Sequence, residues 1–349
     1  MTLDALFRPY RLTPRLTLPN RIVLAPCTRN RATADLSPTP GAARHYGERA
    51  DAGLLITEAV LILPGIQGFI DTPGIFLDSH QRAWAGVADA VHDRGGRIFL
   101  QLWHPGRMSH SHFAGTAPRS ASDVLDPARR RQVGGLELYH ERPWPLSGAE
   151  IGAVIAAYAA AASRAIAAGF DGVEIHAANG YLPEQFWRAH TNRRTDAWGG
   201  TAAGRARFTI EVAGACAQAV GAGRVGIRLS PAAYFSEMKY SDGDNDALDL
   251  ILSNLSDCGL AYVHTGVVTD NPVGYLDGTS TAYLRRRWAG TLIGNGGYTP
   301  GFAAEGIDRG DFDLAAFGKL FLANPDLVAR LSAGADLAPY SRAVLDGFE

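Results

Sequence analysis

The chain has 349 residues, of which 46% are hydrophobic and 19% charged, as in an ordinary soluble globular protein. Its formal net charge of −2 gives no electrostatic reason to expect binding to nucleic acid or to an anionic membrane. Its three cysteines, Cys27, Cys216 and Cys258, lie far apart. This spacing argues against a disulfide scaffold, a zinc ribbon or an iron–sulfur cluster, and is compatible with a reducing cytoplasm.

No stretch has the composition of a linker, so residues 1–349 are expected to form a single domain, either as a monomer or in a homodimer. The amino terminus lacks the basic segment and apolar core of a secretory signal, and a cytoplasmic location is expected. The most apolar stretch, residues 151–170, is rich in alanine and carries Arg164 inside it. It is therefore expected to be a core-facing helix and not a membrane span.

Short apolar runs recur along the chain, and segments with a helical pattern lie between them. Alternating strands and helices predict parallel strands joined by crossovers, and eight such units predict a (β/α)8 TIM barrel. The predicted strands are 21–26, 53–58, 97–102, 172–175, 225–229, 261–264, 291–294 and 313–318. The predicted helices are 40–50, 80–93, 150–167, 204–219, 246–258, 282–288, 300–309 and 325–333.

An open doubly wound sheet is the alternative fold, but it would need fewer units or a dinucleotide-binding glycine fingerprint after the first strand. The sequence has neither. Two stretches fall outside the eight units. Residues 10–20, with spaced prolines, are predicted to form a hairpin that closes the bottom of the barrel. Residues 105–145, after the third strand, are polar and rich in glycine and proline, which is typical of a lid or a binding loop.

The fourth predicted strand ends on a group of polar side chains. The carboxyl ends of barrel strands face the active site, so chemistry is expected here. If the chain makes one turn after Ile175, His176 and Asn179 project the same way and could grip one small acceptor, with Tyr181 across the same pocket. The alternative is a polar cluster that caps the following helix, and these residues alone leave both readings open.

The loops after the seventh and eighth strands are rich in glycine, and in many such barrels these loops bind a phosphate. Lys319 adds a positive charge there. Arg228 ends a strand in the barrel mouth, where it needs an anionic or carbonyl partner. A structural ion pair with Glu58 or Glu174 is the open alternative. Gln101 and Thr28 are neutral hydrogen-bonding groups, which suit the edge of a polar heterocycle.

No pair of carboxylates is placed for glycoside hydrolysis, and no serine or cysteine stands beside a histidine as a nucleophile. A phosphorylated heteroaromatic cofactor fits these residues better. Several motifs follow one another over nearly the whole chain: LPNR at 18–21, APCTR at 25–29, QLWH at 101–104, HAANGYL at 176–182, QF at 185–186, RTDAWGG at 194–200, RLSP at 228–231, GNGGY at 294–298 and ANPD at 323–326. In this order they resemble the Old Yellow Enzyme family of FMN-dependent ene reductases.

The resemblance implies a non-covalent FMN at the barrel mouth. Thr28 would then bind the flavin C4 carbonyl and Gln101 the pyrimidine edge, while Arg228 would lie by N1 and the C2 carbonyl. Pro26 and Ala59 would line the ring with backbone groups, and Trp103 and Phe235 would wall the substrate space. The residues implied for the phosphate and its loops are Asn295, Gly296, Gly297, Gly318 and Lys319.

The resemblance also implies a reaction in two halves at one site. NADPH or NADH gives a hydride to flavin N5, and an α,β-unsaturated carbonyl or nitro compound then takes that hydride at its β-carbon. His176 and Asn179 would hold the substrate oxygen. Tyr181, with an ordinary pKa of about 10, would give the α-carbon its proton.

Other readings remain open at this stage. The barrel could reduce another electrophile, such as a nitroester, a nitroaromatic or a quinone, or act as a flavin carrier or sensor without turnover. A metal-dependent hydrolase could use His104, His110, His112 and His176, although matching carboxylates are missing.

The chain departs from the family pattern in Lys319, where arginine is frequent, and in the bulky, charged segment 187–190. It also lacks the aromatic-bearing carboxyl-terminal tail that many relatives fold over the site. Cys27 precedes the flavin-contacting Thr28, and no redox-tuning role is expected of it.

Overall fold

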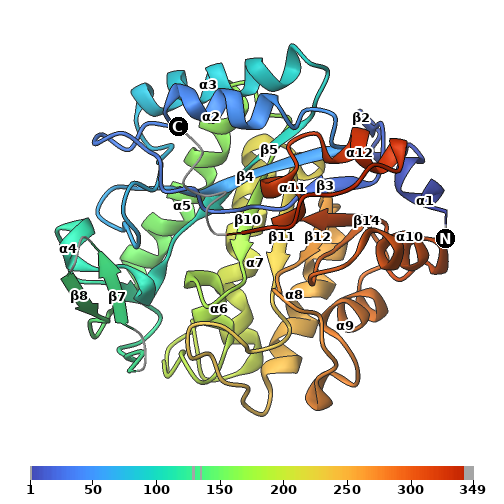
Figure 1. Ribbon diagram of the computed structural model, residues 1–349. Helices are drawn as coiled ribbons and strands as arrows, with labels where there is room; N and C mark the ends of the chain where they lie inside the picture. The colour runs from blue at the N-terminus through green and yellow to red at the C-terminus, as the bar shows by residue number, and fades with distance from the viewer. Residues whose placement is uncertain (1, 128–129, 134–135, 342–349) are drawn as a thin grey trace.

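The computed structural model describes residues 2–127, 130–133 and 136–341. Its centre is a closed barrel of parallel strands, in which each strand pairs with its neighbours along the chain and the last pairs with the first (Figure 1). This confirms the predicted (β/α)8 barrel. The strands are β3 (Ile22–Leu24), β4 (Leu54–Leu61), β5 (Ile98–Trp103), β10 (Gly172–Ala177), β11 (Val225–Leu229), β12 (Tyr262–Thr265), β13 (Leu292–Gly294) and β14 (Leu314–Phe317).

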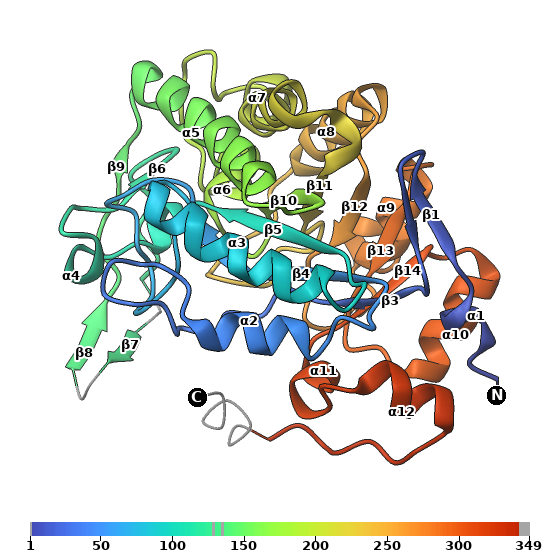
Figure 2. The same cartoon turned by 90° about the horizontal axis from the view of Figure 1, so that it is seen from above.

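The helices surround the barrel, as Figure 2 shows from above. The main ones are α2 (Pro40–Gly47), α3 (Asp78–His92), α5 (Gly148–Ala167), α7 (Ala202–Val220), α8 (Asp244–Cys258), α9 (Ser280–Arg287), α10 (Pro300–Arg309) and α12 (Leu327–Ala333). Their positions agree with the predicted ranges. Four further helices are too short to show a helical period in the sequence: α1 (Asp4–Phe7), α4 (Ser111–Ala114), α6 (Leu182–Trp187) and α11 (Lys319–Ala323). Single turns of 3-10 helix lie at Gly106–Met108, Ala222–Arg224 and Gly274–Leu276.

The two stretches outside the eight units have ordered structure. The predicted hairpin is confirmed as the antiparallel pair β1 (Tyr10–Thr13) and β2 (Leu16–Leu18). The segment after β5 contains more structure than a plain loop. Its short strands β6 (Arg119–Ser120) and β9 (Trp144–Pro145) pair in parallel, and β7 (Arg130–Val133) and β8 (Leu136–Tyr139) form a hairpin that projects from the barrel (Figure 1).

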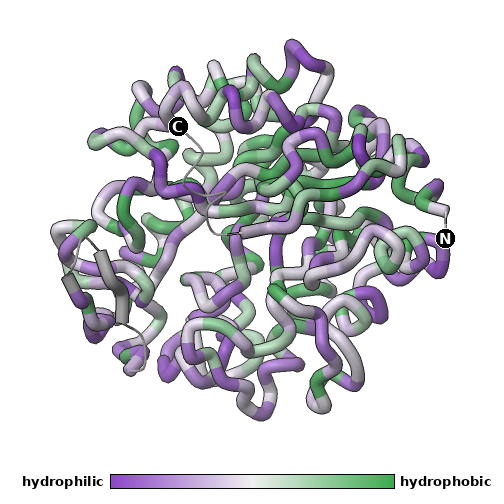
Figure 3. The backbone as a smooth tube through the Cα atoms, viewed as in Figure 1, coloured by the Kyte–Doolittle hydropathy of each residue, from purple (hydrophilic) through white to green (hydrophobic). Residues whose placement is uncertain are grey.

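The barrel strands are buried along their whole length because helices cover the outer face and side chains fill the interior. Hydrophobic residues accordingly concentrate in the central strands, while hydrophilic ones lie mostly at the periphery (Figure 3). Three charged side chains of the barrel strands are also buried: Glu58, Glu174 and Arg228. Buried charges need partners, so these residues mark where function has to be considered.

Helix α5 is the one helix, among the described residues, that is long and apolar enough to cross a membrane by length and composition alone. It begins with a capping box, in which the Ser147 side chain accepts from the Glu150 backbone and the Glu150 carboxylate accepts from the Ser147 backbone. Ile151, Val154 and Tyr158 recur at helical spacing on its buried face. A core-facing helix of a globular protein passes the same test, so the membrane evidence is weak.

Two residues of the charged segment 187–190, at the end of α6, belong to the core. Trp187 and Arg188 are buried, and the Arg188 guanidinium donates to Glu184 at 2.9 Å and lies 3.6 Å from Asp244. It also donates to the backbone carbonyl of Ser230 at 2.7 Å. Arg188 therefore ties α6 and the start of α8 to the loop that follows β11, on the side of the barrel where the active site is expected.

Replacing Arg188 with leucine should lower the free energy of unfolding by roughly 3–5 kcal/mol, because two buried carboxylates lose their cation. Urea denaturation measures the change. Arg207→Leu is the matched control: its pair with Glu211 has the same i,i+4 spacing but is more than one-third exposed, so the cost should stay below about 1 kcal/mol. Equal costs for the two variants would show that the Arg188 network contributes no special stability.

Candidate active site

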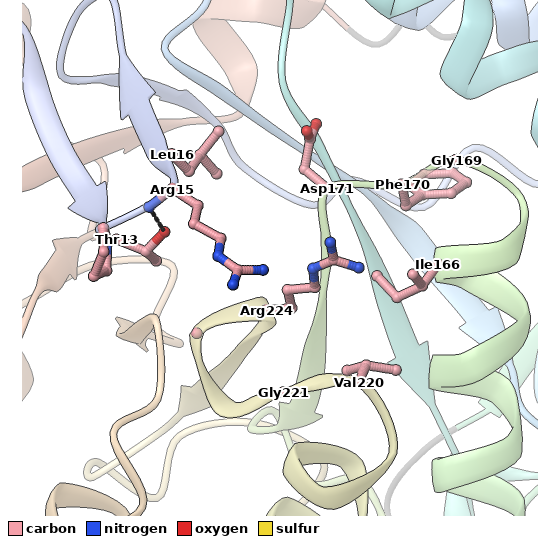
Figure 4. Close-up of a pocket in the computed structure, with 12 residues that line it drawn as sticks. Thr13, Arg15, Leu16, Ile166, Gly169, Phe170, Asp171, Val220, Gly221 and Arg224 are labelled. Carbon is pink, nitrogen blue, oxygen red and sulfur yellow. Dashed lines mark hydrogen bonds between the residues drawn. The ribbon is translucent and has the colours of Figure 1, made fainter.

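Two cavities of about 640 Å³ lie at opposite ends of the barrel. One lies between the β1–β2 hairpin and the segments that enter β10 and β11, with Arg15 and Arg224 pointing into it (Figure 4). Asp171, at its edge, accepts from His92 at 3.0 Å and from the backbone of Ile98 at 2.8 Å. Both arginines are exposed. Asp171, just before β10, links the start of that strand to the start of β5. This end of a barrel serves stability.

The other cavity lies at the carboxyl ends of the strands, where active sites of this fold occur. It is bordered by the loops after β3, β10, β11, β12, β13 and β14. Eight of the residues predicted for cofactor, substrate or catalysis line it: Pro26, Asn179, Arg228, Phe235, Asn295, Gly297, Gly318 and Lys319.

The other predicted residues lie outside the cavity lining. Thr28 is exposed, although its neighbour Cys27 lines the cavity. The remaining six are buried: Ala59, Gln101, Trp103, His176, Tyr181 and Gly296. The buried Gln101 amide donates to the Glu174 carboxylate at 2.7 Å.

Arg228 carries a buried positive charge at the cavity. The two alternative partners suggested by the sequence are already engaged: Glu174 accepts from Gln101 and from His264 Nδ1 at 2.8 Å, and Glu58 accepts from the Arg29 backbone at 3.0 Å. No hydrogen bond or ion pair joins Arg228 to any other residue in the described part of the chain, although it is only 7% exposed. A guanidinium in this state needs an acceptor from outside the protein.

Arg228 does act on Glu174 through its charge. Burial alone would raise the pKa of Glu174, but His264, Arg228 and Gln101 together bring it below the ordinary value. Burial lowers the pKa of His264, so the imidazole is neutral and its Nδ1–H donates to the carboxylate. Glu174 is therefore negatively charged and lies deeper in the barrel than the positively charged Arg228, which lines the cavity.

In the turn after β13, the glycines Gly296 and Gly297 are needed for two different reasons. A Cβ on Gly296 would lie 2.3 Å from the Cβ of Asp270, so this glycine is needed for packing. Gly297 has a φ of +74°, which glycine adopts at little cost. Asn295 holds the turn by donating to the Val267 carbonyl at 2.9 Å. The turn therefore presents its backbone to the cavity that the exposed Lys319 also lines.

His176 and Tyr181 do come together, in a cluster of rings beside the cavity. Tyr181 packs edge-on against His176, with ring centroids 4.7 Å apart, and against Trp103 at 5.1 Å. Burial and then the charge of Arg228 lower the pKa of His176 well below its ordinary value. His176 is thus a neutral imidazole with one N–H to donate, which suits a grip on an oxygen atom.

Asn179 has a left-handed backbone with a φ of 59°, a conformation that asparagine tolerates better than most residues. Its backbone N–H donates to Ser230 Oγ at 3.1 Å. Gly180 follows with a φ of 77°, and a Cβ there would lie 2.7 Å from the Cβ of Ser236. This strained turn aims the Asn179 side chain into the cavity instead of along the strand.

Three further residues of the cavity were not assigned a role from the sequence. Tyr234 lines it next to the predicted Phe235. Burial raises the pKa of the Cys27 thiol to about 11, so a neutral thiol faces the cavity. Tyr340 lies with its ring centroid 5.8 Å from Lys319 Nζ. Tyr340 thus brings an aromatic ring of the segment after α12 to the cavity.

Two of the four histidines proposed for a metal site, His104 and His110, are engaged elsewhere. His104 Nδ1 accepts from the Gly106 backbone at 3.0 Å, and His110 Nδ1 accepts from the His112 backbone as the cap of α4. Across residues 2–127, 130–133 and 136–341 no three histidine, cysteine, aspartate or glutamate side chains form a group that could hold a metal ion. The geometry does not favour the metal-dependent hydrolase.

Stability should fall in mild acid because three buried histidines resist protonation. Burial lowers the pKa of His45 to about 2, that of His104 to about 3 and that of His176 well below 6.5. Below pH 6.5 the unfolded chain binds these protons and the folded chain does not. Each histidine then removes about 1.4 kcal/mol of stability per pH unit. Urea denaturation at pH 7.5, 6 and 5 should show this loss, and His45→Gln should reduce it. A flat profile would contradict the prediction.

The sequence matches the model of the NADH:flavin oxidoreductase / NADH oxidase family over residues 5–337. The barrel, its carboxyl-end cavity and this match define the class: the protein is a flavin-dependent oxidoreductase. The chain belongs to the NADH:flavin oxidoreductase / NADH oxidase family, the family of the Old Yellow Enzyme homologues, as the sequence motifs indicated.

Similar proteins agree with this assignment. The chain is 39% identical to 12-oxophytodienoate reductase 7 of Oryza sativa subsp. japonica, over 97% of this chain and 90% of that protein. It is 39% identical to 12-oxophytodienoate reductase 2 of Arabidopsis thaliana, over 97% and 91%. The structure of morphinone reductase in complex with tetrahydroNAD superposes with a TM-score of 0.90 at 39% identity, covering 98% of this chain and 94% of that one. The Old Yellow Enzyme homologue of Zymomonas mobilis superposes with a TM-score of 0.91 at 35% identity, covering 98% and 96%.

Proposed function

We propose that the protein reduces the activated C=C bond of α,β-unsaturated carbonyl or nitro compounds, with FMN as cofactor and NADPH or NADH as the hydride donor. The observation that carries this proposal is Arg228 at the mouth of the carboxyl-end cavity, which is almost fully buried and has no hydrogen bond or ion pair to any residue that the structure describes. The names of the similar reductases and the nicotinamide analogue bound by morphinone reductase support it.

The residues of the cavity fit FMN. Arg228 would face the electron-rich pyrimidine edge of the flavin, and Lys319 with the backbone at Gly297 and Gly318 would hold the phosphate at the other end. A Cβ on Gly318 would lie 3.1 Å from Cys27 Sγ, so any larger residue here would push the Cys27 side chain aside. FMN bound there would supply the hydride that it takes from the nicotinamide.

The protein's own residues would perform the polar part of the reaction. His176 and Asn179 would donate hydrogen bonds to the substrate oxygen, which polarises the alkene and stabilises the negative charge that develops there. Tyr181, buried against His176, would deliver a proton to the α-carbon. The surrounding rings, including Trp103 and Phe235, would keep water from the reacting carbons.

The test is the visible spectrum of the purified protein, followed without oxygen by NADPH and then by 2-cyclohexenone. Bleaching by NADPH and recovery of the yellow colour with the enone would establish both half-reactions. Recovery only with a nitroester or a quinone would move the activity to another electrophile, and no bleaching would favour a carrier or sensor. Parallel titrations with NADPH and NADH would decide the donor.

We also propose a cytoplasmic enzyme that acts on small molecules as a monomer or homodimer. In support, Cys27, Cys216 and Cys258 are all free thiols, as in a reducing compartment. Sedimentation of the purified protein would decide between monomer and homodimer.

A further inference from the structure

The side-chain amide of Asn179 makes an unusual contact inside the cavity. Its Oδ1 atom accepts from the phenolic O–H of Tyr234 at 2.5 Å, across the gap between the loops after β10 and β11. Tyr234 also lines the cavity. An amide has one acceptor end and one donor end, so whatever binds the acceptor decides which end faces the ligand.

The hydrogen-bond inventory around Tyr234 favours one orientation. A phenol has a single hydrogen, and Tyr234 has two acceptors in reach, Asn179 Oδ1 at 2.5 Å and the Gly266 carbonyl at 3.0 Å. The Gly266 carbonyl already accepts from Ser230 Oγ at 2.7 Å. Among the described residues, the Asn179 oxygen has one other donor in reach, the distant Ser230 Oγ at 3.5 Å. Tyr234 therefore donates its phenolic hydrogen to Asn179 Oδ1.

The phenol of Tyr234 stays a donor. Desolvation raises the pKa of Tyr234, which keeps the phenol protonated and able to donate at any ordinary pH. In the reversed orientation the Asn179 NH2 would face the phenol oxygen, and the amide carbonyl would face the cavity. The phenolic hydrogen would then turn to the Gly266 carbonyl, which already accepts from Ser230 Oγ.

We propose that Tyr234 is a positioning residue that holds the Asn179 amide with its NH2 toward the ligand. The site then offers donors only, from Asn179 and from the neutral His176, and selects ligands whose bound atom is a pure acceptor, such as a carbonyl, nitro or phenolate oxygen. This inference rests on the proposed function, because it concerns the same ligand oxygen. It adds Tyr234, which lies outside the donor pair and decides which end of the Asn179 amide faces the ligand.

The experiment is a double-mutant cycle on the FMN-loaded protein, with 4-hydroxybenzaldehyde as probe. Its phenolate, bound over the flavin, is followed by the long-wavelength charge-transfer absorbance. Tyr234→Phe should weaken binding of this phenolate about tenfold, as expected for an amide that is no longer held. In the Asn179→Ala background the same substitution should have almost no effect, because the amide it would orient is gone. A merely structural role would weaken binding in both backgrounds.

Tyr240→Phe is the matched control on the same loop. Tyr240 stacks on Tyr275 with centroids 4.0 Å apart, outside the cavity lining, so phenolate binding should not change. The ratio of FMN to protein confirms that each variant is folded. Equal phenolate affinity in the wild type and Tyr234→Phe, or an equal loss in both backgrounds, would overturn the role of Tyr234 alone. A wild-type protein that holds FMN but binds no phenolate would overturn this inference together with the proposed oxyanion grip.

Discussion

Tyr181→Phe should slow reoxidation of the reduced enzyme by an enone by about 10²- to 10⁴-fold, the usual contribution of a positioned general acid. Reduction of the flavin by NADPH should remain nearly intact, because that half-reaction needs no proton from this side chain. The loss of the hydroxyl should cost little structure, since the ring keeps its edge-on packing against His176 and Trp103. Anaerobic stopped-flow absorbance separates the two half-reactions.

The pH dependence provides a check on the same prediction. With phenylalanine at position 181 the proton must come from water, so the residual rate of reoxidation should depend on buffer and pH. If both half-reactions fell equally in Tyr181→Phe, the assignment of Tyr181 as the proton donor would be wrong, and a general disturbance of the FMN site would explain the loss.

The double replacement His176→Ala with Asn179→Ala should abolish binding of phenolic ligands. Each hydrogen bond to a charged oxygen contributes about 1.5–3 kcal/mol, so losing both weakens binding at least about 100-fold. Turnover with enones should fall by a comparable or larger factor, because the same donors stabilise charge in the transition state. Spectral titration with 4-hydroxybenzaldehyde measures the first effect and steady-state kinetics the second.

The content of bound FMN provides the control for this variant. Arg228, Lys319 and the glycine turn are unchanged, so the variant should still purify yellow. Unchanged phenolate affinity in a yellow protein would rule out the oxyanion grip, whereas a colourless protein would show that one of the two residues also supports the cofactor site.

The barrel could be predicted from the sequence because its signals are local. A strand buried on both faces appears as a short apolar run, and an amphipathic helix shows its period over several turns. For this reason β11 was predicted at its observed bounds, and α10 likewise. Short elements such as α6 and α11 have no period to read, and the β7–β8 hairpin lies in a segment whose composition indicates only a loop.

The membership of the site could also be predicted in part, since parallel strands bring their carboxyl ends to one face. Asn179 follows β10, Arg228 lies at the end of β11, and Gly318 and Lys319 follow β14, so residues from three strands line one cavity. The sequence could not decide whether Arg228 pairs with Glu58 or Glu174. That depends on which acceptors lie closer to other donors, and the answer involves His264, Gln101 and Arg29.

The amino-acid sequence by itself thus determined the architecture, the order of the strands and the residue types that meet at the barrel mouth. These follow from periodicity and from the geometry of parallel strands. Only the tertiary structure decided that Arg228 makes no hydrogen bond or ion pair within the described part of the chain, that Arg188 is a core residue, and that Tyr340 and Tyr234 reach the site. The reason is physical: hydrogen-bond partners are chosen by distances of a few tenths of an ångström between segments far apart in the chain, and no local pattern encodes those distances.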